Sequence, residues 1–163
     1  MKIKLTANLC YLAGLQDKAR FTDRAIGIST RIDELEQKFT EICVKELKIE
    51  PNRIIVREEG GSKQIYFYHS KIYRELLEIN SNATRIFRYS NNEFSRVYVA
   101  GIFDAAGHVE KGRIRINGLT RSDELVLENL GIHTMNGTIL NAGPFIKLIK
   151  GFSIMLEHYT IDK

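Results

Sequence analysis

The chain contains only two cysteines, no long hydrophobic run and no strong excess of either charge. Cys10 and Cys43 each fall within a predicted helix. We therefore expect two buried, reduced thiols rather than a disulfide or a metal site, which favours a cytoplasmic location. No apolar run approaches the roughly 20 residues that a membrane-spanning helix needs, so no membrane partner is expected. The apolar stretch 8–15 is too short and too polar at its edges for a secretory signal.

The charges are nearly balanced along the chain. Lys and Arg number 24 and Asp and Glu 20, giving a net charge of +4 over 163 residues. The two halves, 1–80 and 81–163, have the same net charge, so there is no basic tail, and a nucleic-acid-binding surface must depend on where individual charges lie. A Walker loop, a dinucleotide fingerprint, zinc-ligand spacing and a nucleophile elbow are all absent from the sequence. These absences exclude the commonest nucleotide-binding, zinc and hydrolase classes.

The sequence does contain a pattern that occurs twice. Residues 12–20, Leu-Ala-Gly-Leu-Gln-Asp-Lys-Ala-Arg, are echoed at 99–107 by Val-Ala-Gly-Ile-Phe-Asp-Ala-Ala-Gly. A second repeated segment lies C-terminal to each copy, Thr-Arg-Ile-Asp-Glu-Leu at 30–35 and Thr-Arg-Ser-Asp-Glu-Leu at 120–125. Two echoes in the same order indicate one structural unit used twice.

We expect the two copies to share one compact domain, because units this small bury too little surface to be stable alone. The predicted division is a first repeat over 1–80, a linker over 81–95 and a second repeat over 96–163. The protein is expected to be a monomer with an internal pseudo-twofold axis.

Hydrophobic periodicity predicts the same element order in each copy: helix, two strands, helix, two strands, helix. In the first copy we predict a helix over 8–18, a strand over 24–29, a helix from Ile32 to before Pro51, a hairpin of 53–58 and 63–69 around Gly60-Gly61, and a helix over 71–79. In the second copy we predict a strand over 113–117, a hairpin turn at Asn136-Gly137 and a last helix opened by Gly143-Pro144. Capping boxes are predicted at Thr30 with Asp33 and at Thr120 with Asp123. The predicted fold class is α+β, two αββαββα repeats whose strands form a curved saddle with helices behind.

The first helix of each copy carries adjacent small residues, Ala13-Gly14 and Ala100-Gly101. Small side chains allow two helix backbones to approach closely. We therefore expect these two helices to pack against each other, with their C-terminal ends side by side on the twofold axis.

Both nine-residue motifs resemble the LAGLIDADG signature of homing endonucleases and their maturase and intein relatives, and the second copy matches it better. The resemblance implies that the eighth motif residue should be an acid that binds a divalent metal beside the scissile phosphates. Here the eighth residues are Ala19 and Ala106, which have no ligand atom. We therefore predict no catalytic residue and no metal cofactor, and lean towards a protein that is not an enzyme.

Other carboxylates could restore a metal site. Asp17 and Asp104 lie two residues before the alanines, about 200° around a helix, so they should face elsewhere. Asp23 and Glu110 each follow an alanine by four residues and could supply a carboxylate from the hairpin. If either pair does so, Mg²⁺ becomes the expected cofactor.

The strand faces supply the predicted nucleic-acid-binding residues. Arg can bind the edge of guanine with two donors, and Asn can bind adenine in the same way. The predicted binding residues are Arg113, Arg115, Asn117, Ser29, Arg53, Arg57, Lys63, Gln64, Tyr66 and Tyr68. Of these, Lys63 is the candidate for the basic residue that the family places near the scissile phosphate.

The leading hypothesis is a protein derived from a homing endonuclease that binds duplex DNA without cleaving it, with a regulatory role. Duplex DNA is preferred over RNA because the major groove of A-form RNA is too deep and narrow to be read directly. The alternatives are an active metal-dependent endonuclease with displaced ligands, a maturase-like factor that binds RNA, and a scaffold whose sheet binds another protein.

Overall fold

The structure, a computed structural model, describes residues 3–18, 24–89 and 92–161. In chain order the elements are α1 (Ala7–Lys18), β1 (Ile26–Thr30), α2 (Asp33–Glu41), the π-helix η1 (Ile42–Glu46), the 3-10 helix η2 (Pro51–Arg53), β2 (Ile55–Glu59), β3 (Ser62–Phe67), α3 (Ser70–Ser81), α4 (Ala83–Ile86), α5 (Glu93–Ala106), β4 (Gly107–Glu110), β5 (Arg113–Ile116), α6 (Arg121–Asn129), β6 (Thr134–Met135), β7 (Thr138–Ile139), α7 (Ala142–Ile149) and α8 (Ile154–Ile161).

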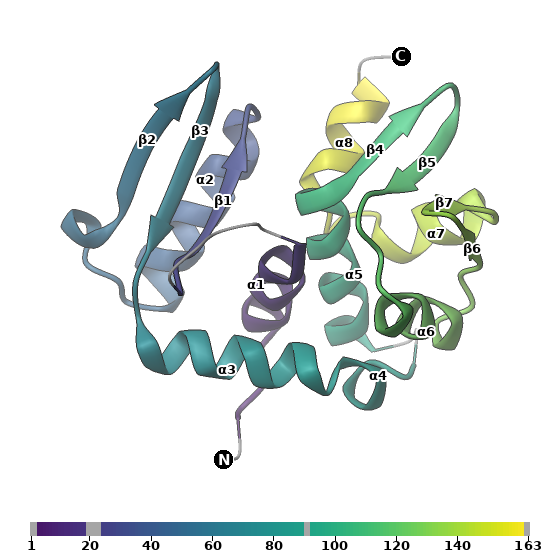
Figure 1. Cartoon of the computed structure of the whole chain (residues 1–163), viewed down its shortest axis with the longest axis horizontal. Helices are drawn as coiled ribbons and strands as arrows, with labels where there is room; N and C mark the ends of the chain where they lie inside the picture. The colour runs from purple at the N-terminus through teal and green to yellow at the C-terminus, as the bar shows by residue number, and fades with distance from the viewer. Residues whose placement is uncertain (1–2, 19–23, 90–91, 162–163) are drawn as a thin grey trace.

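The α+β class is confirmed, with two antiparallel sheets that lie on either side of a central pair of helices (Figure 1). The strands are ordered β1-β3-β2 in the first sheet and β4-β5-β7-β6 in the second. β1 and β5 therefore occupy matching places, each beside the last strand of its half. The position that corresponds to β4 in the first half falls at 19–23, outside the described residues.

The central helices α1 and α5 pack through the small residues that the sequence singles out. A Cβ atom built on Gly14 would lie 2.1 Å from the carbonyl oxygen of Tyr98, and one built on Gly101 would lie 2.3 Å from that of Tyr11. The two contacts are reciprocal, since Gly14 and Gly101 hold equivalent places in the two motifs. The expected packing of the two helices is confirmed.

The hydrophobic core surrounds this helix pair and extends beneath both sheets. In the first half, Phe39 of α2 packs against Phe67 of β3, with ring centroids 6.4 Å apart. In the second half, Phe103 of α5 packs against Phe145 of α7 at 5.7 Å. Cys10 and Cys43 are buried free thiols, as expected. Among the described residues, no helix combines the length and apolarity needed to span a bilayer.

The two predicted capping boxes have different outcomes. Thr120 and Asp123 form the reciprocal box at the start of α6, as predicted. The box at Thr30 is wrong, because Thr30 is still paired with Lys63 in the sheet and α2 begins only at Asp33. The Thr30 hydroxyl instead accepts a hydrogen bond from the N–H of Ile32.

Two further predictions need correction. Pro144 is the third residue of α7 rather than the first, a position whose missing N–H also has no partner within the helix. In addition, α7 is not the last helix, because α8 follows it. The predicted linker contains α4 and the start of α5, and Phe87 within it is completely buried.

Candidate nucleic-acid interface

The register of the first sheet divides its side chains between two faces, because residues paired across antiparallel strands project to the same side. Ile26 and Ile28 pair with Phe67 and Ile65, and all four are buried against the helices. We call the opposite side of each sheet its open face. In the first sheet the open face comprises Gly27, Ser29, Ile55, Arg57, Glu59, Ser62, Gln64 and Tyr66.

Tyr66 lies on the open face yet is itself buried. Its register partner is Gly27, and a Cβ atom there would lie 2.4 Å from the Cβ of Tyr66. The Tyr66 ring is flanked by the Arg57 guanidinium, 5.9 Å from its centroid, and by Tyr68 in an edge-on arrangement. Tyr66 therefore supports Arg57 and Tyr68, while Ser29 and Arg57 are exposed to solvent.

Two predicted binding residues of the first half lie elsewhere. Arg53 ends η2, before β2 begins, so it is not a strand residue. Lys63 shares the helix-facing side of β3 with Ile65, and its ammonium group lies 3.2 Å from the carboxylate of Glu36 on α2. The hydrogen bond with Glu36 raises the pKa of Lys63. Strand alternation alone places Lys63 on the opposite side of β3 from Gln64, so these two predicted binding residues do not share a face.

The open face of the second sheet is richer in cationic and polar groups. It comprises His108, Glu110, Arg113, Arg115, Met135 and Thr138. Ile114 and Ile116 are buried on the other side, so the predicted alternation along β5 is confirmed. His108, Thr138 and Met135 were not predicted to belong to this surface. Register with β5 identifies His108 and Thr138, and pairing with Thr138 of β7 adds Met135. Only the structure supplies these registers.

Arg115 is held in place by the neighbouring hairpin. Its guanidinium donates to the hydroxyl of Thr138 at 3.1 Å and to the carbonyl of Asn136 at 3.1 Å. Arg113 is exposed and lies opposite Glu110 in the register. Asn117 follows β5, with its backbone N–H bonded to the carbonyl of Ala106 at the end of α5. A polar hollow of about 330 Å³ opens here, lined by Arg115, Ile116, Asn117, Gly118, Leu119, Glu124, Asn136 and Gly137.

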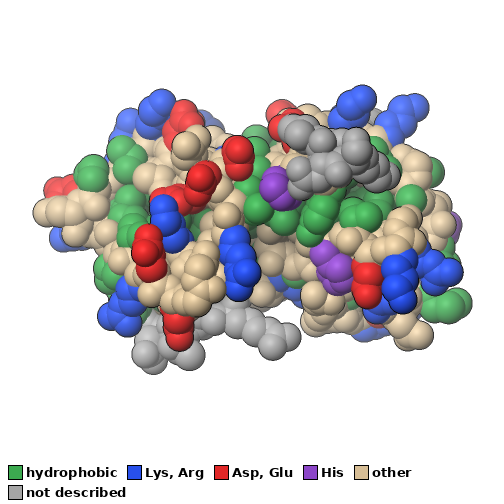
Figure 2. Space-filling model, turned by 90° about the horizontal axis from the view of Figure 1, so that it is seen from above, with side chains coloured by type: hydrophobic (Ala, Val, Ile, Leu, Met, Phe, Trp, Pro, Cys, Tyr) green, Lys and Arg blue, Asp and Glu red, His purple; other side chains and the backbone are tan. Residues whose placement is uncertain are grey.

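The upper surface of the molecule carries both charge signs. Figure 2 shows basic and acidic side chains interspersed on the left of the view, with hydrophobic side chains reaching the surface nearer its centre and right. The first open face itself carries both signs, with Arg57 and Glu59 two residues apart on β2. Binding to a polyanion must therefore rely on placed side chains rather than on a uniform positive field.

The acidic residue of the second motif has a structural role. Asp104 on α5 is buried, and its carboxylate accepts hydrogen bonds from the Tyr11 hydroxyl, the Ser153 hydroxyl at 2.5 Å and the N–H groups of Ile154 and Met155 at 3.0 Å each. Burial raises the pKa of Asp104, while these hydrogen bonds act to lower it. The carboxylate thus holds the start of α8 against α5.

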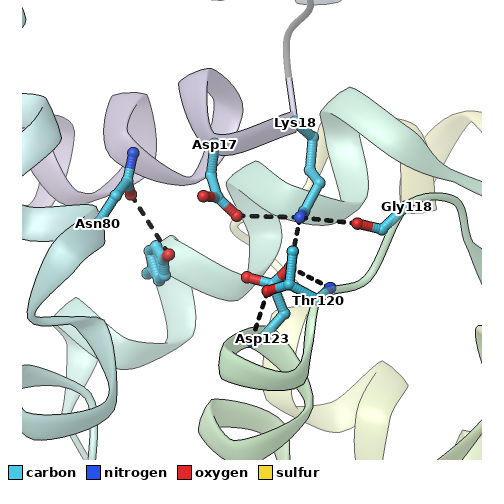
Figure 3. Close-up of polar contacts among 7 residues, drawn as sticks. Asp17, Lys18, Asn80, Gly118, Thr120 and Asp123 are labelled. Carbon is cyan, nitrogen blue, oxygen red and sulfur yellow. Dashed lines mark hydrogen bonds and ion pairs between the residues drawn. The ribbon is translucent and has the colours of Figure 1, made fainter.

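The equivalent acid of the first motif belongs to an ion cluster between the two halves. Figure 3 shows Lys18 reaching from the end of α1 towards Asp123 and Thr120 at the start of α6. The Lys18 ammonium donates to the carboxylate of Asp123 and to the carbonyl of Gly118 at 3.0 Å, and lies 3.2 Å from the Asp17 carboxylate. Burial, together with the neighbouring Asp123 carboxylate, raises the pKa of Asp17 to about 6. Neither Lys18 nor Asp123 was singled out from the sequence for this contact.

The described residues at the helix ends do not fit a divalent cation. Ala106, the last residue of α5, has only a methyl side chain, and Asp104 is already committed to α8. Glu110 lies at the far end of β4, where its carboxylate is 3.6 Å from His108. Within the described ranges, no three His, Cys, Asp or Glu residues gather as a metal site would require. Ala19 and Asp23 lie outside the described residues.

Comparison with known proteins identifies the fold. No protein-family model and no curated protein sequence matches this chain. Solved structures do match: I-DmoI in complex with DNA and Mn has a TM-score of 0.66 at 15% identity, covering 89% of this chain and 97% of that one. I-DmoI in complex with DNA and Ca has a TM-score of 0.68 at 14% identity, covering 95% and 97%. Mesophilic variants of the homing endonuclease I-DmoI give 0.64 at 16%, covering 88% and 94%. The expected LAGLIDADG endonuclease fold is thereby confirmed.

Proposed function

We propose that this protein binds duplex DNA across the open faces of its two sheets and does not cleave it. The observation that carries the proposal is the second open face, where Arg115 is held by Thr138 and Asn136 beside an exposed Arg113. The fold is one whose solved examples include a homing endonuclease in complex with DNA. A two-stranded antiparallel ribbon fits the major groove of B-form DNA.

Arg115 is suited to reading a base. The guanidinium has five N–H donors, and two of its hydrogen bonds are made within the protein, which leaves donors for a ligand. Because the side chain is already ordered, little conformational entropy remains to be lost on binding. A guanidinium offers the paired donors that match O6 and N7 of guanine.

The first open face differs chemically from the second. Ser29 and Gln64 are register partners, with Arg57 beside Gln64 on the next strand. Gln can bind adenine with a donor and an acceptor. Two faces of unlike composition should favour a target site whose two halves also differ in sequence.

The absence of cleavage is inferred from the donor groups at the end of α5. Hydrolysis of a phosphodiester by metal ions requires ligands that hold the cation beside the phosphate. In the second motif the methyl group of Ala106 occupies the ligand position, and the nearby Asp104 carboxylate is used by α8. A regulatory role would follow from selective binding without cutting.

Selection from a pool of random DNA duplexes tests the proposal. The protein should enrich particular sequences at low salt, its affinity should fall steeply as salt rises, and Mg²⁺ should not be needed. Adding Mg²⁺ or Mn²⁺ and scoring the pool for nicks tests the alternative of an active endonuclease in the same reaction. Cleaved products would overturn the proposal, and preferential retention of folded RNA would favour the maturase-like alternative.

A further inference from the structure

The short helix α4 is firmly anchored, although it lies in the segment predicted as a linker. Ala83 and Phe87 are buried, and the Phe87 ring stacks on Tyr98 with centroids 4.1 Å apart. The side chain of Asn82 accepts a hydrogen bond from the Arg85 guanidinium at 3.3 Å. Because two side chains of this segment are fixed in the core, its remaining side chains are presented to solvent from an ordered backbone.

The outward side of this segment forms a polar hollow. It has a volume of about 520 Å³ and is lined by Thr84, Arg85, Arg88, Tyr89 and Asn129. Arg85 and Arg88 are exposed, and among the described residues neither lies within ion-pair distance of a carboxylate. Tyr89 is 68% exposed, more than any other large hydrophobic side chain in the described part of the chain.

This hollow is separate from the open faces of the sheets. In Figure 1, α4 lies along the lower edge of the molecule, whereas the β2–β3 and β4–β5 turns lie along the upper edge. Asn129, from the end of α6, forms part of the hollow, so the surface spans the joining segment and the second half. A ligand here would not compete with a duplex bound across the sheets.

We propose that this hollow binds an unpaired nucleotide within a single-stranded nucleic acid. Two guanidinium groups that form no ion pair with a described carboxylate match the charge and geometry of phosphate, and an exposed tyrosine ring offers a stacking surface for a base. A duplex keeps its bases stacked inside and cannot use the ring of Tyr89 in this way. Asn129 and Thr84 add hydrogen-bonding groups beside the ring. The inference goes beyond duplex binding by the sheets and does not depend on it.

Fluorescence anisotropy with short labelled strands tests the inference, using oligothymidylate and oligouridylate to separate DNA from RNA as the source of the nucleotide. Tyr89→Leu and Arg88→Ala should each weaken binding by about fivefold or more, because base stacking and phosphate contact are lost separately. Arg74→Ala removes an exposed arginine of α3 outside the hollow and serves as the charge-matched control. Its affinity should stay within about twofold of the unaltered protein.

Each outcome bears on the proposal. Thermal unfolding of the three variants should match that of the unaltered protein, so that loss of binding reports the surface and not the fold. An excess of random-sequence duplex should leave the labelled strand bound, and displacement would overturn a separate site. An equal loss of affinity for the labelled strand in Arg74→Ala and Arg88→Ala, or no loss of affinity in Tyr89→Leu, would overturn nucleotide recognition. Displacement by polyglutamate as effective as by unlabelled strand would assign the surface to an acidic protein segment instead.

Discussion

Two glycines determine how closely the central helices approach each other. The atoms that a side chain at Gly14 or Gly101 would meet are backbone carbonyl oxygens of the facing helix, at 2.1 and 2.3 Å. Backbone atoms cannot rotate out of the way as the end of a flexible side chain can. The glycines of both motifs are therefore required by packing, whatever the protein binds.

Replacing Gly14 by alanine should force α1 and α5 apart. We expect Gly14→Ala to lower the free energy of unfolding by about 2 kcal/mol or more, since overpacking a well-packed contact costs this order of energy. Gly143→Ala, on α7 where nothing lies within 4 Å of the added methyl group, should change stability by less than about 1 kcal/mol. Urea denaturation measures the free energy of unfolding of both variants. An equal decrease in the two variants would contradict the close contact at Gly14.

Arg113 and Arg115 should contribute differently to DNA binding if the proposed function holds. Arg115→Lys loses the two parallel N–H donors of the guanidinium, so discrimination between bases at one base pair should fall by about 1–3 kcal/mol. Arg113→Ala should weaken all duplexes similarly and reduce the slope of log affinity against log salt concentration by about one. Repeating the selection with each variant separates these effects, and Arg74→Ala provides the control. Identical changes in both variants would argue against a base-reading role for Arg115.

Asp17 should make stability depend on pH in a direction unusual for an acid. Its pKa is about 6 in the folded protein against an ordinary value of 3.8. Between about pH 4 and 6 the unfolded chain has released this proton while the folded protein retains it. The contribution of Asp17 to the free energy of unfolding therefore falls as pH rises through this window. Asp17→Asn, which cannot ionise, should show a smaller fall between pH 4 and 6 in urea denaturation.

Asp123 provides the internal check on that measurement. Burial acts to raise its pKa, but hydrogen bonds from Lys18 and from the N–H of Thr120 lower it overall. Its contribution to stability is lost as pH falls below about 4, outside the Asp17 window. A slope between pH 4 and 6 that is unchanged in Asp17→Asn would assign the dependence to another group.

At the level of elements, the two motif acids show how equivalent positions acquire different roles. Asp104 fixes the start of α8, whereas Asp17 lies beside Lys18 and Asp123 at the start of α6. The tyrosines that immediately precede the two motifs differ as well, because Tyr11 donates to Asp104 while Tyr98 donates to Asn80 at 3.3 Å. The helix pair is thus nearly symmetric in its packing and asymmetric in its polar contacts.

Removing the Asp104 carboxylate should release α8. Asp104→Ala leaves the Tyr11 and Ser153 hydroxyls and the N–H groups of Ile154 and Met155 without this acceptor. Buried donors without partners are costly, so we expect a loss of about 3 kcal/mol in stability. Hydrogen exchange should show faster exchange in α8 than in α5. As a control, Asp17→Asn should leave the amides of α8 protected from exchange. Equally fast exchange in α5 and α8 of Asp104→Ala would contradict this anchoring role.

At the scale of the whole molecule, contacts between the two halves are numerous and varied. Besides the helix pair and the Lys18 cluster, Lys38 on α2 donates to the carbonyl of Phe152 in the second half at 2.7 Å. Within its own half, the Lys38 ammonium lies 3.8 Å from the centre of the Tyr11 ring. Burial lowers the pKa of Lys38. These contacts favour the proposed organisation, in which the two repeats form one domain that folds as a unit.

That organisation predicts a single cooperative unfolding transition. Amides of β3 in the first sheet and β5 in the second should show the same free energy of opening in hydrogen exchange. Lys18→Met, which leaves Asp17 and Asp123 without their cation, should lower both values together by about 3 kcal/mol. A first sheet that opens at lower denaturant than the second would show two separate units.

Much of the fold could be predicted because its signals are local. The alternation of Ile26 with Ile28 and of Ile114 with Ile116 identified strands and their buried faces. The turn at Asn136-Gly137 forms as predicted, with positive φ at both residues. The failure at Thr30 has a physical cause, since its hydroxyl and the following acid satisfy a capping pattern while sheet pairing keeps the residue extended.

The sequence by itself determined the strand alternation, the close-packed glycines of the central helices and the presence of alanine at the eighth position of the second motif, because each depends on residue type and local spacing. It did not predict α4 and α8. Only the tertiary structure decided that Lys63 faces Glu36, that Tyr66 covers Gly27 and that Arg115 is held by Thr138. It also decided that Lys18 joins the halves through Asp123. These contacts connect residues distant in the chain, and their partners are fixed by strand register and helix packing, which no local pattern specifies.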